Sequence, residues 1–271
     1  MRDFSAKVVV ITGAAGGLGR ALCLRFGQAG ARIVALDRDA PALDALLGEL
    51  HRAGIEATSA PGDVAVEEDC RNAMAAAKRA FGAIDVLVNN AGITHRSAFA
   101  HTEPAVIRQV MAVNFFGALH CTHAALDELV AHRGMVIAIS SVAGFAPLIA
   151  RTGYAASKHA LHGFYDSLRT ELAPLGVPVM LVCPSFIATG IEKNALDGQG
   201  QPVRHAQSVV GARATPASIA DKIFHAAQKE RRLLLPDPVS RASWWVSRLL
   251  PALYARLMVN RLRSEMQSGR R

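Results

Sequence analysis

The sequence has little cysteine and little proline, and it lacks any CxxC pair. Its four cysteines are scattered over 271 residues, at Cys23, Cys70, Cys121 and Cys183. This spacing predicts reduced core thiols of a cytoplasmic protein and argues against a disulfide framework or a metal site. The 12 prolines and a hydrophobic fraction of 51% exclude an intrinsically disordered chain. Residues 1–7 lead directly into an apolar run, so we expect no secretory signal peptide.

Acidic residues are scarce near the C-terminus, and this accounts for the net charge of +8. Residues 231–271 contain nine arginines, and their only acids are Asp237 and Glu265, which leaves a balance of +7. The rest of the chain therefore carries only +1. The positive charge therefore belongs to the C-terminal segment, and it indicates nothing about the function of the rest of the chain.

Apolar runs typical of buried strands alternate with helical patterns, as crossover connections in a parallel sheet require. We expect strands at Lys7–Thr12, Arg32–Leu36, Glu56–Ala60, Val86–Asn89, Met135–Ser140, Pro178–Cys183 and Leu233–Leu235. We expect helices at Gly17–Ala29, Pro41–Ala53, Glu67–Phe81, Pro104–His132, Tyr154–Ala173 and Pro216–Glu230. The pattern predicts an α/β fold with a doubly wound, Rossmann-like sheet of seven parallel strands and helices on both faces. This domain would cover residues 1–235, followed by a basic amphipathic extension over 236–271.

A glycine-rich turn, Gly13–Gly19, follows the first expected strand and precedes a helix. Glycines let the backbone approach a pyrophosphate, whose charge the helix N-terminus favours. Asp37 ends the second strand, where a carboxylate can accept a hydrogen bond from a ribose 2′-hydroxyl and would repel a 2′-phosphate. NAD is therefore the favoured cofactor. NADP stays an alternative because the guanidinium of the neighbouring Arg38 could hold that phosphate, unless Arg38 is simply a solvated turn residue.

Tyr154 and Lys158 are four residues apart and share one face of an expected helix. A phenol with a pKa of about 10 is a poor acid–base group at neutral pH. A nearby ammonium favours the phenolate and brings the phenol closer to useful acid–base strength. A tyrosine and a lysine four residues apart are common in helices, so this pair indicates a catalytic site only if other motifs of such a site accompany it.

These motifs resemble those of the short-chain dehydrogenase/reductase family over roughly residues 5–235. Thr12–Gly19 is similar to the family's TGxxxGxG pattern, Asn89–Gly92 to its NNAG segment, and Asp63-Val64 to its adenine-pocket dipeptide. Including Asp37 and the Tyr–Lys pair, the resemblance implies a cofactor site formed by Thr12, Gly13, Gly17, Leu18, Gly19, Asp37, Asp63, Val64, Asn90, Ala91, Gly92, Tyr154, Lys158, Pro184, Ile187 and Thr189.

The resemblance extends to a catalytic tetrad of Asn114, Ser141, Tyr154 and Lys158, because the first two lie at the family's intervals from the Tyr–Lys pair. It implies a phenolate at Tyr154 that takes the substrate's hydroxyl proton while a hydride passes to the nicotinamide. Ser141 would hold the substrate oxygen, with Lys158 and Asn114 passing the proton to solvent. Ser140 is expected to be a structural hydroxyl. Homodimers or homotetramers are also implied.

The expected function is hydride transfer between NAD and a hydrophobic secondary alcohol or ketone. Two alternatives stay open: an NADP-dependent carbonyl reductase, and a catalytically silent cofactor-binding regulatory or membrane-adaptor protein. The apolar substrate pocket, or simply loop packing, would involve Phe145, Pro147, Leu148, Phe186, Ile187 and Ile191. We expect His95 and Arg96 to be solvated and a mobile flap over Glu192–Gly211. Ser185 departs from the family's Pro-Gly sequence, which puts the local shape of the pocket in question.

The C-terminal extension predicts a basic amphipathic helix, which Pro251 kinks or divides. On one helical wheel the arginines share a face, with Val246, Leu250, Leu253, Leu257 and Met258 roughly opposite. Packing over the substrate cleft or against a partner subunit, and peripheral membrane contact, are the alternatives. The frequent arginines argue against a membrane span, and we expect no nucleic-acid binding.

Overall fold

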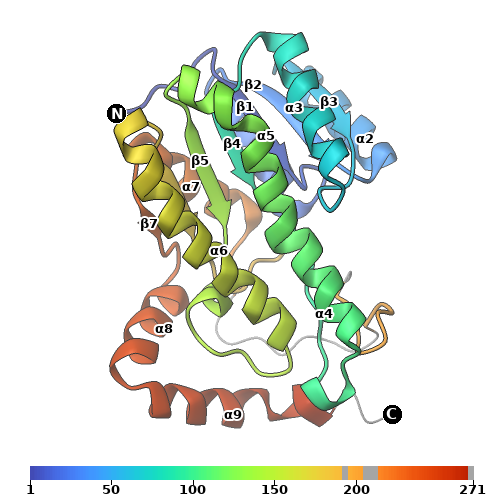
Figure 1. The fold of residues 1–271 in the computed structure, drawn as a ribbon, viewed down its shortest axis with the longest axis vertical. Helices are drawn as coiled ribbons and strands as arrows, with labels where there is room; N and C mark the ends of the chain where they lie inside the picture. The colour runs from blue at the N-terminus through green and yellow to red at the C-terminus, as the bar shows by residue number, and fades with distance from the viewer. Residues whose placement is uncertain (191–194, 204–212, 268–271) are drawn as a thin grey trace.

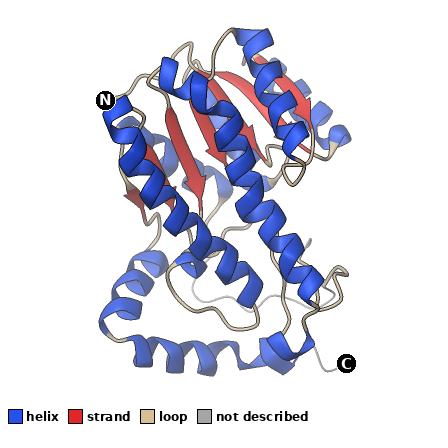
Figure 2. Cartoon of the chain, viewed as in Figure 1, coloured by secondary structure: helices blue, strands red, loops and turns tan. Residues whose placement is uncertain are grey.

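The computed structural model describes residues 1–190, 195–203 and 213–267, with side chains up to Arg261 in the last helix. Seven parallel strands form one sheet in the order β3-β2-β1-β4-β5-β6-β7. The strands are β1 (Val8–Thr12), β2 (Arg32–Asp37), β3 (Ala57–Pro61), β4 (Val86–Asn89), β5 (Met135–Ile139), β6 (Val179–Val182) and β7 (Leu233–Leu234). The order reverses between β1 and β4, and helices flank both faces of the sheet (Figures 1 and 2). This confirms the expected Rossmann-like fold.

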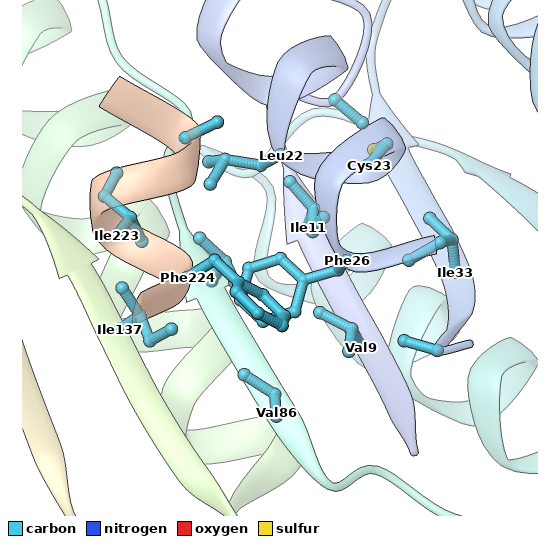
Figure 3. Close-up of a cluster of buried hydrophobic side chains, with 14 of the residues drawn as sticks. Val9, Ile11, Leu22, Cys23, Phe26, Ile33, Val86, Ile137, Ile223 and Phe224 are labelled. Carbon is cyan, nitrogen blue, oxygen red and sulfur yellow. The ribbon is translucent and has the colours of Figure 1, made fainter. Parts of the chain in front are cut away.

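The two faces of the sheet have separate apolar cores because successive strand residues point to opposite sides. Val9 and Ile11 of β1 pack on one side with Phe26 and Phe224. The rings of Phe26 and Phe224 lie 5.3 Å apart, and the cluster is shown in Figure 3. On the other side, Val8 and Val10 pack among residues of three further helices. With every residue of β1 buried, the carboxyl end of this strand is a rigid base for the turn that follows it.

Helices connect the strands in the expected places. They are α1 (Gly17–Gly27), α2 (Ala40–Arg52), α3 (Glu67–Phe81), α4 (Pro104–Met111), α5 (Gly117–Ala131), α6 (Thr152–Leu172) and α7 (Pro216–Gln228). The single helix expected over Pro104–His132 is interrupted by a π-helical turn at Ala112–Phe116, which has Asn114 at its centre. Such turns occur mostly at functional sites. The expected flap over Glu192–Gly211 is described only for residues 195–203, which contact the segment after β4 through Leu196; the rest of this expectation lies outside the described residues.

Beyond the sheet, the C-terminal extension forms two helices, α8 (Pro238–Leu249) and α9 (Pro251–Gln267). The break falls at Leu250–Pro251, as the proline predicts. In Figure 1 the pair lies below the sheet, with α9 crossing beneath the end of α6. Tyr254 and Met258 pack on Ala146, so the inner side of the pair rests on the domain. None of the described helices is long and apolar enough to span a membrane.

Because the helix is divided, the single helical wheel expected for the extension is wrong. Met258 is buried and Val246 is partly buried against the domain. In contrast, Leu250, Leu253 and Leu257 are 55%, 46% and 40% exposed. The change of direction at Pro251 resets which residues face inward, so residues opposite the arginines on one continuous wheel do not all reach the core.

Candidate active site

A cavity of about 540 Å³ lies along the carboxyl ends of the strands, where ligands bind in open α/β sheets. Residues that follow six of the seven strands line it, from Gly13 after β1 to residues 184–187 after β6. It brings together most of the site residues expected from the sequence: Gly13, Gly17, Leu18, Gly19, Asp37, Asp63, Val64, Asn90, Ala91, Gly92, Ser141, Tyr154, Lys158, Pro184, Ile187 and Thr189. Thr12 and Asn114 lie behind its wall, each 1% exposed.

The glycine turn between β1 and α1 can be built only with glycine at two positions. Gly13 has a φ of 62°, and a Cβ there would lie 2.8 Å from the Ala91 Cα. A Cβ on Gly19 would collide with the carbonyl oxygen of Gly13. Gly16, the N-cap residue of α1, has no side chain that could cap the helix. The uncapped helix N-terminus thus faces the cavity with a close-packed backbone, as an anion-binding turn requires.

Behind this turn, hydrogen bonds tie the end of β1 to the segment after β4. The Thr12 hydroxyl oxygen accepts the N–H groups of Asn90 and Ala91 at 3.0 and 2.9 Å. The Asn90 side-chain amide donates to the carbonyl oxygens of Thr12 and Gly13, at 2.9 and 3.1 Å. Thr12 therefore positions the turn from behind the cavity wall, and Asn90 joins the two loops that line it.

At the end of β2, Asp37 is fixed by backbone donors. Its Oδ2 accepts the Ala15 N–H at 3.0 Å, and its Oδ1 accepts the Asp39 N–H at 3.2 Å. Arg38 beside it is exposed, and both side chains line the cavity. The carboxylate is oriented within the glycine turn, whereas the guanidinium lies at the solvent edge.

Lys158 lies on α6 in an almost dry position, 4% exposed. Its ammonium donates a 2.8 Å hydrogen bond to the Ile139 carbonyl oxygen at the end of β5. The same Nζ lies 5.8 Å from the centre of the Tyr154 ring. Burial lowers the pKa of Lys158 to about 8, so the group is poised close to neutral pH.

The phenol of Tyr154 faces opposing influences. Burial raises its pKa above the ordinary value, whereas a hydrogen bond with Ser141 and the positive charge of Arg151 lower it. The sequence pointed to Lys158 as the favourable charge, and its Nζ does lie near the phenol ring; Arg151 is a second positive charge that the sequence pattern did not indicate. Ser141 also accepts the Ala143 N–H at 3.2 Å, which fixes its hydroxyl at the turn after β5. Its neighbour Ser140 donates to the Lys158 carbonyl oxygen at 3.4 Å and also lines the cavity.

Both polar atoms of the Asn114 side chain form hydrogen bonds to neighbouring segments of the cavity wall. Its Oδ1 accepts the Ile93 N–H at 2.8 Å, and its Nδ2 donates to the Ile93 carbonyl oxygen at 3.0 Å and the Ser157 hydroxyl at 2.9 Å. A Cβ on Gly92 would lie 3.2 Å from the Asn114 Oδ1 and 3.6 Å from the Lys158 Nζ. Asn114 thus joins the loop after β4 to α6, directly behind the Tyr–Lys pair.

The expectation that His95 and Arg96 are solvated is wrong, since they are 0% and 3% exposed. The Nε2 of His95 accepts the Gly153 N–H at 2.9 Å at the start of α6. Burial, with a smaller effect of Arg151, lowers the pKa of His95 to about 4, so this histidine is a neutral acceptor. Sequence reasoning also missed Arg151, which is buried, lines the cavity and donates to Thr94 at 3.3 Å. The only sequence signal for a role of Arg151 was its position just before the helix that carries Tyr154 and Lys158.

Ser185, the departure from the family's glycine, joins the loop after β6 to α8. Its N–H donates to the Asp237 Oδ2 at 3.0 Å and its hydroxyl to the Asp237 Oδ1 at 2.7 Å. Asp237 also caps α8 by accepting the Ser240 N–H at 2.8 Å. One buried carboxylate therefore fastens both the loop after β6 and the first helix of the extension.

The far wall of the cavity is mostly apolar, and part of it comes from the extension. Of the pocket residues expected from the sequence, Leu148, Phe186 and Ile187 line the cavity. Phe145 instead packs edge-on against Trp244 at 4.8 Å, Pro147 is absent from the lining, and Ile191 lies outside the described residues. The roof of the cavity is formed by side chains of α8 and α9: Val239, Ser243, Tyr254 and Met258.

Comparison with known proteins agrees with this geometry. A family model described as short chain dehydrogenase matches residues 7–200. The chain belongs to the short-chain dehydrogenase/reductase family. Dehydrogenase/reductase SDR family member 7B of Bos taurus is 38% identical over 269 residues, covering 96% of this chain and 83% of the bovine protein. The Mus musculus protein of the same name is 35% identical, with the same coverage.

Solved structures of the family superpose closely. A short-chain dehydrogenase/reductase from Burkholderia phymatum, in complex with NAD, has a TM-score of 0.84 and 26% identity, covering 93% of this chain and 96% of its own. A short-chain dehydrogenase from Streptomyces avermitilis has a TM-score of 0.80 and 28% identity, covering 96% and 97%. As a member of this family, the chain is an NAD(P)-dependent oxidoreductase.

Proposed function

We propose that this short-chain dehydrogenase/reductase transfers a hydride between NAD and a hydrophobic secondary alcohol or ketone. The observation that carries the proposal is that one cavity is lined by the glycine turn, by Tyr154, Ser141 and Lys158, and by the apolar roof from α8 and α9. An acid–base group, an oxygen-orienting hydroxyl and a buried cation thus lie where a cofactor and an apolar substrate would meet.

The residues present fit a dinucleotide. The uncapped start of α1 and the close-packed Gly13 suit a pyrophosphate. The oriented carboxylate of Asp37 suits an unmodified ribose, which supports NAD over NADP. Ile187 and Thr189 line the cavity and would contact the nicotinamide, as the family resemblance implies. The NAD in the Burkholderia phymatum structure supports the same assignment.

When bound, a nicotinamide would accept or supply the hydride. Tyr154 would then hold the proton of the reacting oxygen: its phenolate accepts the proton in oxidation, and its phenol returns it in reduction. Ser141 would orient the substrate oxygen toward Tyr154 through its hydroxyl. Lys158 would bind the ribose and move the proton onward. Asn114 holds Ile93 and Ser157 and so would keep this wall in place for a relay water.

The roof supports an apolar substrate. Tyr254 and Met258 are 5% and 9% exposed and are held on the domain, so a bulky carbinol would find ordered apolar walls. Among the described lining residues near the roof, the polar groups are Arg151 and the hydroxyl groups of the serine and tyrosine side chains. A cytoplasmic homo-oligomer, with the faces of α4–α5 and α6 as contacts, is part of the proposal.

A panel of hydrophobic secondary alcohols and ketones, with sugars and small alcohols as controls, tests the proposal. Each is assayed with NAD and NADP forms by nicotinamide absorbance. We expect turnover of the hydrophobic compounds with NAD and little turnover of the sugars. Preference for NADP would favour the carbonyl-reductase alternative through Arg38. Cofactor binding without turnover of any compound would favour the silent adaptor.

A further inference from the structure

The outer surface of α8 and α9 gathers most of the large apolar side chains that the described residues expose. Elsewhere such side chains are far apart in the sequence, at Met1, Val66, Phe99, Phe116 and Leu175. On the two helices, six occur within fifteen residues: Trp245, Leu249, Leu250, Leu253, Leu257 and Val259. Scattered apolar residues are normal on a protein surface, but a group of this kind marks an interaction site.

These side chains are not the ones that hold the helices on the domain. Trp245 and Leu249 are 62% and 70% exposed and are one turn apart. They lie on the side of α8 away from the buried Ser243. In α9 the inner positions are Tyr254 and Met258, and the exposed leucines flank them. Each helix therefore has an inner side packed on the domain and other apolar side chains that the described residues leave exposed. Figure 1 shows the pair at the edge of the molecule.

The charged residues of α8 and α9 are mostly positive, five arginines against the single acid Glu265. From Pro238 to Arg261 the sequence has four arginines and no acidic residue, and all four arginines are exposed. Asp237, the acid just before them, is buried and engaged as the cap of α8. A second copy of the chain would bring a surface of the same positive sign to the contact. An anionic lipid surface offers both apolar chains and complementary headgroups.

We propose that α8 and α9 dock the enzyme on an anionic lipid bilayer. Trp245, Leu249 and Leu253 enter the interface, where tryptophan is favoured, and the arginines contact the headgroups. The helices lie in the plane of the surface because none of the described helices can span it. Their inner faces line the cavity, so docking places the roof of the pocket against lipid.

Tryptophan fluorescence gives a direct readout, because the chain has only two tryptophans and both are in α8. In the full chain, Trp244→Phe leaves Trp245 as the only reporter. We expect its emission to shift to shorter wavelength on vesicles of phosphatidylcholine with phosphatidylglycerol. Brominated lipid should quench it. Co-sedimentation with these vesicles should exceed that with phosphatidylcholine alone and should weaken as salt is raised.

Matched variants distinguish binding through α8 and α9 from nonspecific adsorption to vesicles. Trp245→Ser with Leu249→Ser should lower vesicle affinity by at least about tenfold, from the apolar area that no longer enters the interface. Arg241→Gln with Arg256→Gln should weaken binding to anionic vesicles and remove its salt dependence. The controls Phe99→Ser with Leu175→Ser, and Arg79→Gln with Arg52→Gln, change exposed residues of the same kinds elsewhere and should bind like the parent chain.

Three results would overturn the proposal: no binding to anionic vesicles, unchanged binding of the Trp245 and Leu249 double variant, or quenching equal for all vesicle compositions. If the double variant instead changes the oligomeric state by light scattering while vesicles bind neither protein, the face belongs to a second copy. NAD binding by each variant checks that it is folded, and this readout is independent of lipid binding and of turnover.

Discussion

The hydrogen bonds between Ser185 and Asp237 should contribute both to the stability of the folded chain and to substrate binding, so that one substitution affects both. Asp237 is 7% exposed and accepts three hydrogen bonds, two from Ser185 and one from Ser240. Ser185→Ala removes one hydrogen bond to a buried carboxylate and should lower the free energy of unfolding by about 1.5–2 kcal/mol. Asp237→Ala also removes the cap of α8, worth about 1 kcal/mol, and should cost about 3 kcal/mol in all.

The same change should loosen the roof against the loop that carries Ile187. We therefore expect Ser185→Ala to raise KM for a bulky hydrophobic substrate about three- to tenfold, with kcat for the bound substrate changing less. The two substitutions together should cost less than the sum of their separate effects, with a coupling of about 1–2 kcal/mol. Urea unfolding and steady-state kinetics measure both effects.

Thr215→Ala is the matched control, because Thr215 caps α7 through the Ser218 N–H at 3.2 Å and lies outside the cavity. It should cost about 1 kcal/mol of stability and leave KM unchanged. The reasoning is refuted if Ser185→Ala alters neither stability nor KM, or if its effect and that of Asp237→Ala simply add.

Three further outcomes are expected. Lys158→Met should abolish turnover yet raise the free energy of unfolding at pH 7 by about 1–3 kcal/mol, since about 1.4 kcal/mol accompanies each pKa unit. Burial lowers the pKa of Lys158 from 10.5 to about 8, so the folded chain binds fewer protons than the unfolded chain between those values. Stability of the parent should therefore rise across pH 8–10.5 and the variant should lose this rise, as urea titrations at several pH values would show. In alcohol oxidation, kcat/KM should rise with pH as Tyr154, whose pKa burial raises, loses its proton. The positive charge of Arg151 lowers the pKa of Tyr154, so Arg151→Met should move the pH profile of kcat/KM to higher pH. An unmoved profile would count against this role of Arg151. Asp37→Ser should weaken NAD binding and improve NADP binding, about tenfold or more in their ratio, by titration; an unchanged ratio would mean that Asp37 does not select the cofactor.

Local patterns were sufficient to predict a seven-stranded parallel sheet and the helices between its strands. The apolar run of β1, the glycines after it and the four-residue spacing of Tyr154 and Lys158 are each set by backbone geometry within one turn or strand. Residues placed by such short-range rules lie in the cavity together. The resemblance to a known family supplied the distant member, Asn114, whose contacts with Ile93 and Ser157 no local rule indicates.

What could not be predicted depends on contacts between distant segments. His95 is neutral and buried because the start of α6 covers it, and nothing near it in the sequence indicates this. Ser185 looked like a local change in the pocket, but its partner Asp237 is 52 residues away. The exposure of Leu253 and Leu257 follows from the turn at Pro251, whose angle the sequence leaves open.

The central claim is that Tyr154 is the acid–base group of this cavity, and Tyr154→Phe tests it most directly. With the best substrate found, the variant should bind NAD like the parent chain but lose turnover by at least about a hundredfold. Tyr165→Phe removes another phenol, one bound to Asn89 and Thr122 away from the cavity, and should lower stability while leaving turnover intact. Undiminished turnover in Tyr154→Phe would contradict the account.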